Sequence, residues 1–270
     1  MTKEESLALL KEQYRLHVGV RLPQVQEILE QKPQEFDFLT MSAWYSHENI
    51  ALKCLFIENE ISKAKQEFYT CGTLTNYRVL RFGYWDENKP TGMDHPSILI
   101  DFMGFTNHIT YILLSDSTEL IAQFSLLSHK WWKQKLKAGI MLFAAAVQAV
   151  LRDDWDGLTE LMPYFDKEIK TTKIVAFDKE FFLGIMENNS SRVTNAIETL
   201  CSKKYHYHRN KYCTAFDLIS FPAAGYAKLA WLKGMQVQTD SPLVPMELMP
   251  IAPLEQYVNP YERFWRLGED

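Results

Sequence analysis

The 270-residue sequence has little glycine, few cysteines and no long uninterrupted apolar run. Its 11 glycines are about 4% of the chain, against a usual value of about 7%, which disfavours turn-rich barrels and sandwiches. Four cysteines spread over such a length do not make a disulfide framework. The longest apolar stretch, 138–151, is shorter than the roughly 20 residues of a membrane span, and so predicts a buried core helix.

A net positive charge and an apolar N-terminal leader are also missing. The first residues, MTKEESLALLKEQYRL, contain no apolar signal core, so we expect a soluble protein of the cytoplasm, with no membrane contact. The net charge of −5 argues against nucleic-acid binding as the main activity, because neutralising phosphates needs a basic surface. Two segments, 130–137 and 203–211, are nevertheless locally basic.

Apolar residues recur at three- and four-residue steps along most of the chain, which predicts helices. Gly72 is a plausible helix end, and Gly234 stands just past another. Asp116, Asp178 and either Ser190 or Ser191 are expected to cap helix starts. The expected helices are 2–16, 23–31, a helical stretch from about 42 to 69, 117–128, 134–151, 154–164, 179–187, 192–203 and 221–233.

A weak periodicity suggests how these helices pack. Residues 149–162 align with 184–197 at a shift of 35, and residues 113–124 fit at a shift of 38. Each copy consists of a helix, two or three small polar residues and a second helix. The prediction is an all-α fold of stacked antiparallel helical hairpins, in a short helical-repeat-like array. Chance similarity between helical segments is the alternative.

One segment interrupts the helical pattern. Residues 72–97 contain three glycines and two prolines, which predicts a long loop or linker. It would divide a helical section, 1–72, from a main helical domain, 98–270, with the loop at 73–97 between them. A single continuous domain is the alternative.

Catalytic motifs are missing: the sequence contains no GxGxxG, GxxxxGK[ST], HExxH, GxSxG or CxxC. One set, Cys201, His206, His208 and Cys213, has ligand types that suit zinc. Its spacing matches no common zinc module, so a polar inter-helix loop with two incidental cysteines is the simpler explanation. We therefore expect no cofactor and no metal.

An acidic cluster lies at the predicted helix junction near residue 154. Its carboxylates suit a divalent cation or acid–base chemistry, but Asp is also a favoured helix cap. A third interpretation is a negative surface for a basic partner, because complementary charge speeds encounter. The cluster consists of Asp153, Asp154, Asp156 and Glu160, with Trp155 among them.

The C-terminal third resembles a known family. In the run FDLISFPAAGYAKLAWLKGMQVQTDSPLVPMELMP, 216–250, a small-residue-rich helix ends in Gly234 and leads into a turn rich in Ser, Asp and Pro. This pattern resembles the closing motif of the immunity protein 49 family of bacterial polymorphic-toxin systems. The segments 177–200 and 144–162, and the stretch from His206 to Arg209, are similar to earlier parts of that family, so the likeness covers roughly residues 140–250.

The resemblance implies a non-catalytic immunity protein that binds a cognate toxin, for example a nuclease, and occludes it. Two surfaces with mixed aromatic and acidic residues are the predicted contacts, since aromatic anchors commonly dominate interfaces. A helical-repeat scaffold for another protein is the alternative, and a metal-dependent enzyme a weaker one. The predicted contacts are Asp153, Asp154, Trp155, Asp156 and Glu160 in the first surface, and Tyr84, Trp85, Asp86 and Glu87 in the second.

Overall fold

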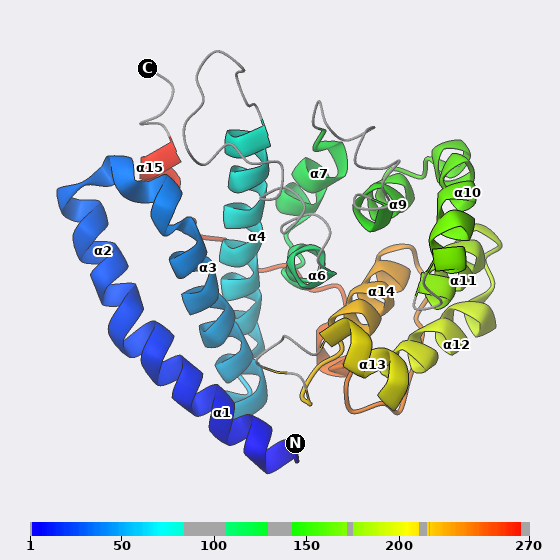
Figure 1. Cartoon of the computed structure of the whole chain (residues 1–270), viewed down its shortest axis with the longest axis horizontal. Helices are drawn as coiled ribbons and strands as arrows, with labels where there is room; N and C mark the ends of the chain where they lie inside the picture. The colour runs from blue at the N-terminus through cyan, green and yellow to red at the C-terminus, as the bar shows by residue number, and fades with distance from the viewer. Residues whose placement is uncertain are drawn as a thin grey trace.

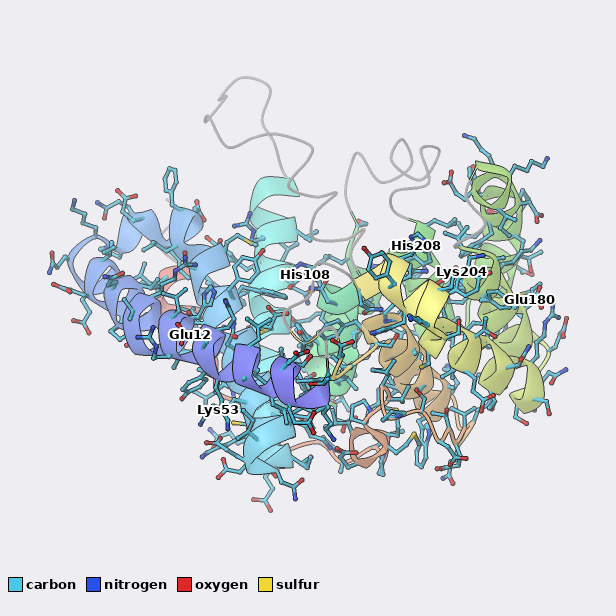
Figure 2. All side chains as sticks on the ribbon, turned by 60° about the horizontal axis from the view of Figure 1, so that its bottom comes forward. Glu12, Lys53, His108, Glu180, Lys204 and His208 are labelled. Atoms are coloured by element: carbon cyan, nitrogen blue, oxygen red, sulfur yellow. The ribbon has the colours of Figure 1, made fainter. Side chains whose placement is uncertain are left out.

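A computed structural model of the chain describes residues 2–83, 106–128, 142–171, 175–210, 215 and 217–265. All regular elements in these ranges are helical and none is a strand, which confirms the all-α prediction. The N-terminal helices lie on one side of the molecule and α10 to α13 on the other, with α6 between them (Figure 1). Glu12 and Lys53 mark the first side, and Glu180 and Lys204 mark the second (Figure 2).

The N-terminal part begins where the sequence predicts. The hydroxyl of Thr2 accepts the N–H of Glu5, whose carboxylate accepts the N–H of Thr2, so a capping box starts the first helix. Pro23 lies in the first turn of the next α-helix, where its missing N–H is not needed. The elements are α1 (Lys3–Leu16), η1 (His17–Arg21), α2 (Leu22–Gln31), η2 (Pro33–Glu35), α3 (Phe36–Lys53), η3 (Cys54–Glu58) and α4 (Ile61–Gly83).

Gly72 does not end a helix, contrary to expectation, because α4 continues to Gly83. A Cβ on Gly72 would lie only 2.7 Å from a methyl of Leu120 and 3.0 Å from a side-chain carbon of Ile112. The glycine is there for close packing against α6 and α7, rather than for a turn. The predicted loop therefore does not begin at 73; its remainder, 84–97, with the predicted contacts Tyr84, Trp85, Asp86 and Glu87, lies outside the described residues.

The C-terminal part is a succession of shorter helices. The helix predicted at 154–164 was too short, since α10 continues to Thr171. The prediction of a polar loop near 203–210 was wrong, because that segment is the helix α13. The helix expected at 221–233 is confirmed, with Gly234 at a φ of +82° just past its end. These elements are α6 (Thr106–Leu114), α7 (Thr118–Leu126), α9 (Leu142–Leu151), α10 (Trp155–Thr171), α11 (Ala176–Met186), α12 (Ser190–Cys201), α13 (Lys203–Asn210), α14 (Phe221–Leu232), η5 (Met246–Leu248) and α15 (Glu262–Trp265).

Three of the predicted caps were assigned to the wrong residue. Ser117, not Asp116, accepts an N–H at the start of α7, and Asn189, not a serine, caps α12. Asp178 lies within α11, and both Asp178 and Asp116 are buried. Each of these two aspartates pairs with a buried cation, which a short sequence window cannot reveal.

Three helix junctions share one backbone geometry. Asp116, Asp153 and Asn188 each have a φ of +50° to +61°, the left-handed region that Asn and Asp tolerate. In each junction the next residue, Ser117, Asp154 or Asn189, accepts the N–H three residues on. The junctions connect α6 to α7, α9 to α10 and α11 to α12. The same backbone geometry therefore recurs in the segments that the sequence periodicity aligned. The shift from Asp153 to Asn188 is 35, as predicted, whereas the shift from Asp116 to Asp153 is 37 rather than 38. That these segments are true repeats stays a prediction.

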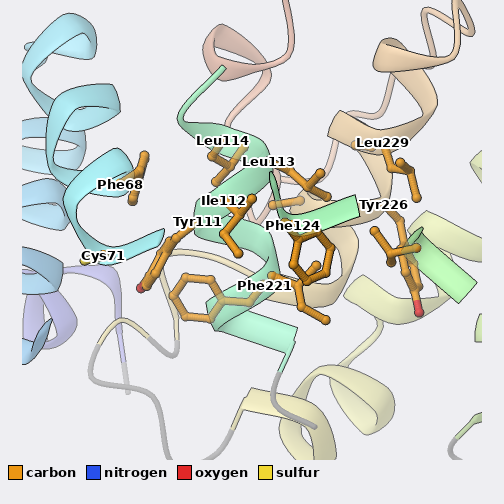
Figure 3. Packing of buried hydrophobic residues seen from close by; sticks show 14 of the residues in the cluster. Phe68, Cys71, Tyr111, Ile112, Leu113, Leu114, Phe124, Phe221, Tyr226 and Leu229 are labelled. Atoms are coloured by element: carbon orange, nitrogen blue, oxygen red, sulfur yellow. The ribbon is translucent and has the colours of Figure 1, made fainter. Parts of the chain in front are cut away.

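The core is centred on α6 and α14. The ring of Tyr111 in α6 stacks on Phe68 of α4 at 5.0 Å and meets Phe221 of α14 edge-on at 5.2 Å (Figure 3). Tyr226 of α14 stacks on Phe181 of α11 at 4.2 Å. Because α14 is buried from Phe221 to Ala230, it is the helix around which α6, α11 and α12 pack.

A C-terminal strap, residues 245–265, crosses the molecule from α14 to α3. The ammonium of Lys228 donates to the carbonyls of Leu248, Met249 and Pro250 and pairs with Asp116 at 2.5 Å. Lys65 pairs with the same carboxylate at 2.7 Å and donates to the carbonyl of Ala252. This buried ion triad fixes the strap to the α6–α7 junction and to α4.

Candidate functional site

The acidic cluster predicted from the sequence lies at the α9–α10 junction. Asp153 adopts the left-handed conformation, and its N–H donates to the carbonyl of Val150 at 3.1 Å. The N–H of Asp154 reaches the carbonyl of Ala149 at 2.9 Å. Both hydrogen bonds satisfy backbone carbonyls at the end of α9, so the conformation of this turn is fixed by the fold.

Two of the four carboxylates have structural partners. Asp154 accepts the N–H of Gly157 at 2.9 Å, which makes it the cap of α10, and Arg152 lies 3.6 Å from its other oxygen. Asp153 pairs with Lys233 at the end of α14 at 2.5 Å. For Asp154 the capping interpretation is therefore right, and its side chain is half-buried.

The other residues of the cluster point to solvent. Trp155 is 38% exposed, although a tryptophan of a monomeric protein is usually mostly buried. Asp156 and Glu160 are exposed, and their spacing places them one turn apart on the same face of α10. Within the described part of the chain, neither carboxylate has a hydrogen-bond or ion-pair partner. These three side chains are available to a partner.

The structure adds an apolar residue that the sequence did not indicate. The amide of Gln148 donates to the carbonyls of Phe124 and Leu127 at 2.6 and 2.9 Å, and Arg152 donates to that of Ser125. These bonds bring the end of α7 to the junction, where Leu126 is 72% exposed. The position of Leu126 in an apolar helical pattern predicts a buried side chain. The packing of α7 on α9 instead leaves this side chain exposed. We call Leu126, Trp155, Asp156 and Glu160 the junction surface.

Neither metal site considered from the sequence is assembled by the described residues. His206 is buried and contacts Asn210 through Nδ1 at 3.1 Å, whereas His208 is exposed on the outside of α13, and Cys213 lies outside the described residues. The carboxylates at 153–160 do not come together either. One other group, Cys54, Glu58 and Glu60, brings its ligand atoms within 4.8 Å of one another. There Glu58 is paired with Lys53, and burial raises the pKa of the Cys54 thiol to about 12, so we assign it no metal.

The molecule is thus a helical protein that exposes aromatic and acidic side chains at the start of α10 and an apolar side chain at the end of α7. Comparison with known families then places it: the model of the family described as immunity protein 49 matches residues 113–248, about half of the chain. The chain belongs to this family, as the resemblance indicated. No curated protein and no solved structure shows significant similarity.

The match covers the last two residues of α6, the helices α7 to α14 and η5, and so includes all three shared junctions. It leaves out α1 to α4 and the strap beyond Leu248. Membership of an immunity-protein family indicates a role in toxin immunity. Among the described residues, no helix combines the length and apolarity that crossing a membrane requires.

Proposed function

We propose that this chain neutralises a cognate bacterial toxin in the cytoplasm by binding it and occluding its active site or substrate groove, without catalysis. The family supports the immunity role, and the junction surface supplies a place to bind. The observation that carries this assignment is the exposure of Trp155 together with the unpaired carboxylates of Asp156 and Glu160 at the start of α10, with Leu126 exposed at the end of α7.

The chemistry of this surface indicates its partner. Large aromatic side chains supply much of the binding energy at protein interfaces when they become buried there. Asp156 and Glu160 would face cations on the partner and speed its approach through complementary charge. A basic toxin surface, such as the substrate groove of a nuclease, fits these requirements, because such a groove must neutralise phosphates.

Co-expression with the cognate toxin domain, sought among the products of the neighbouring genes, tests the proposal. We expect the chain to restore growth and to form a one-to-one complex on gel filtration. The double variant Asp156→Lys/Glu160→Lys should weaken binding at least tenfold, because it places two cations against a basic partner. The matched control, Glu27→Lys/Glu30→Lys, changes the charge equally on the exposed face of α2 and should bind within twofold of the wild type.

Thermal unfolding of both variants separates loss of binding from loss of folding. The proposal of immunity by binding is wrong if the wild-type chain neither restores growth nor forms a complex. The assignment to the junction surface is wrong if the folded α10 variant binds as well as the α2 control.

A further inference from the structure

Helix α13 has an inward face that is fully occupied by the fold. His206 and Asn210 are buried, and Asn210 uses its carbonyl to accept the N–H of Phe221 at 3.0 Å. Arg209 lies between them and binds both oxygens of Asp178, at 3.0 and 2.8 Å. The inward side of this short helix is therefore attached to the start of α14 and to α11.

The ion pair of Arg209 belongs to a buried network that makes this attachment rigid. Asp178 is fully buried in α11 and also accepts the hydroxyl of Tyr226 in α14 at 2.7 Å. The guanidinium of Arg209 also lies over the ring of Phe143 in α9, 4.9 Å from its centroid. Contacts with three helices, α9, α11 and α14, thus determine where α13 lies and which face it turns outward.

The outward face carries cations and an aromatic ring. Lys203, Lys204 and His208 are exposed, and Tyr207 is 55% exposed. Figure 2 shows Lys204 and His208 on α13. In the part of the chain that the structure describes, neither lysine has an acidic partner, unlike Lys53, Lys63, Lys179 and Lys233. We call Lys203, Lys204, Tyr207 and His208 the α13 surface.

The contacts that hold α13 in place do not require the two lysines. His206, Arg209 and Asn210 attach α13 to the core, and Tyr205 meets Phe177 of α11 edge-on at 4.9 Å; none of these contacts involves Lys203 or the charge of Lys204. Two unpaired lysines beside an exposed tyrosine in a chain of net charge −5 make a local positive surface on a negative molecule. Such a surface attracts an acidic partner and orients its approach.

We infer that the α13 surface is a second contact for the toxin and receives an acidic, Asp- or Glu-bearing part of it. The inference rests on the proposed function and adds the chemistry of a second part of the partner. Tyr207 is the residue that would become buried, and Lys203 and Lys204 would form charged contacts around it. A nucleic acid is the less suitable occupant, because its binding draws on many phosphate contacts, whereas this surface offers only the cations of Lys203 and Lys204 and the ring of His208.

The test measures affinity for the catalytically inactivated cognate toxin domain, at 50 and 300 mM NaCl. We expect Lys203→Glu/Lys204→Glu to raise the Kd at least tenfold at low salt, mostly through slower association, and the difference to shrink at high salt. Lys3→Glu/Lys11→Glu, an equal charge change on exposed positions of α1, should stay within twofold of the wild type. Tyr207→Ala, which leaves the charge unchanged, should weaken binding at both salt concentrations.

Each outcome has a distinct meaning. If the wild-type chain binds the toxin and the α13 variants bind equally well, this inference is wrong while the proposed function stands. If the wild type does not bind at all, the proposed function fails. A labelled 30-base-pair duplex DNA and a duplex RNA of the same length test the alternative of a nucleic-acid partner at 50 mM NaCl. The acidic-protein assignment is overturned if the wild type binds either duplex and Lys203→Glu/Lys204→Glu does not.

Discussion

At the scale of single residues, buried carboxyl groups differ in how their charge is compensated. Asp116 is paired with Lys65 and Lys228, and Asp178 with Arg209. Glu48 in α3 is 5% exposed, and its described partner is the hydroxyl of Tyr111, which donates to it at 2.6 Å. Burial raises the pKa of Glu48 from 4.5 to about 7, against the opposing effect of that hydrogen bond.

This carboxyl should make stability depend on pH. The raised pKa means that the folded protein keeps the proton after the unfolded chain has lost it. The contribution of Glu48 to stability is therefore complete below pH 4.5 and is lost as the pH rises through about 7. A difference of about 2.5 pKa units corresponds to about 3 kcal/mol.

The variant Glu48→Gln removes this titration and keeps an oxygen to accept the hydroxyl of Tyr111. We expect it to be more stable than the wild type at pH 8, with a difference that falls between pH 7 and 4.5. Urea unfolding across this range measures it, and Glu27→Gln on the exposed face of α2 is the control. Parallel curves for Glu48→Gln and the wild type would show that Glu48 does not titrate in this window.

At the scale of elements, the left-handed junction that occurs three times in the chain lies in two different environments. The left-handed residue faces solvent at Asp153 and Asn188 but is buried at Asp116. The α6–α7 junction thus carries a charge into the core, where it binds the cations that fix the strap. The backbone of the junction follows from the local sequence, whereas its environment depends on which helices cover it.

A pair of matched substitutions separates these two contributions. Asp116→Asn keeps a residue that tolerates the left-handed backbone but leaves Lys65 and Lys228 buried without a counter-charge. We expect it to lower the free energy of unfolding by about 3–5 kcal/mol. Asp153→Asn makes the same change at the exposed junction and should cost less than about 1 kcal/mol. Chemical denaturation of both variants measures the difference; equal losses would contradict a role for the buried triad.

At the scale of the whole molecule, the strap joins the two ends of the chain. Phe36 of α3 stacks with Tyr261 and Phe264, with ring centroids 5.6 and 5.5 Å apart, and Tyr77 of α4 stacks with Trp265 at 5.3 Å. The part of the strap beyond Leu248 and the N-terminal helices both lie outside the family match. They stabilise each other as one unit on the side of the molecule away from α10 to α13.

Truncating the strap's aromatic end should therefore loosen the N-terminal helices first. We expect Phe264→Ala to cost about 3 kcal/mol, because the ring is 7% exposed and its loss leaves a cavity. Hydrogen exchange should increase in α3 and α4 more than in α11 and α12, which serve as the internal control. A uniform increase over all helices would mean that the strap does not stabilise the N-terminal unit in particular.

The sequence by itself determined the helical fold class, most helix positions and the family, because periodicity and the closing motif depend on residues close together in the chain. It also indicated three of the four residues of the junction surface, Trp155, Asp156 and Glu160, as exposed side chains. Only the tertiary structure decided that Gly72 lies inside a helix, that Asp116 and Asp178 are buried ion partners, and that Leu126 is exposed where the end of α7 docks on α9. The reason is physical: a cap and a buried ion pair look alike within a few residues, and burial depends on partners that are distant in the sequence.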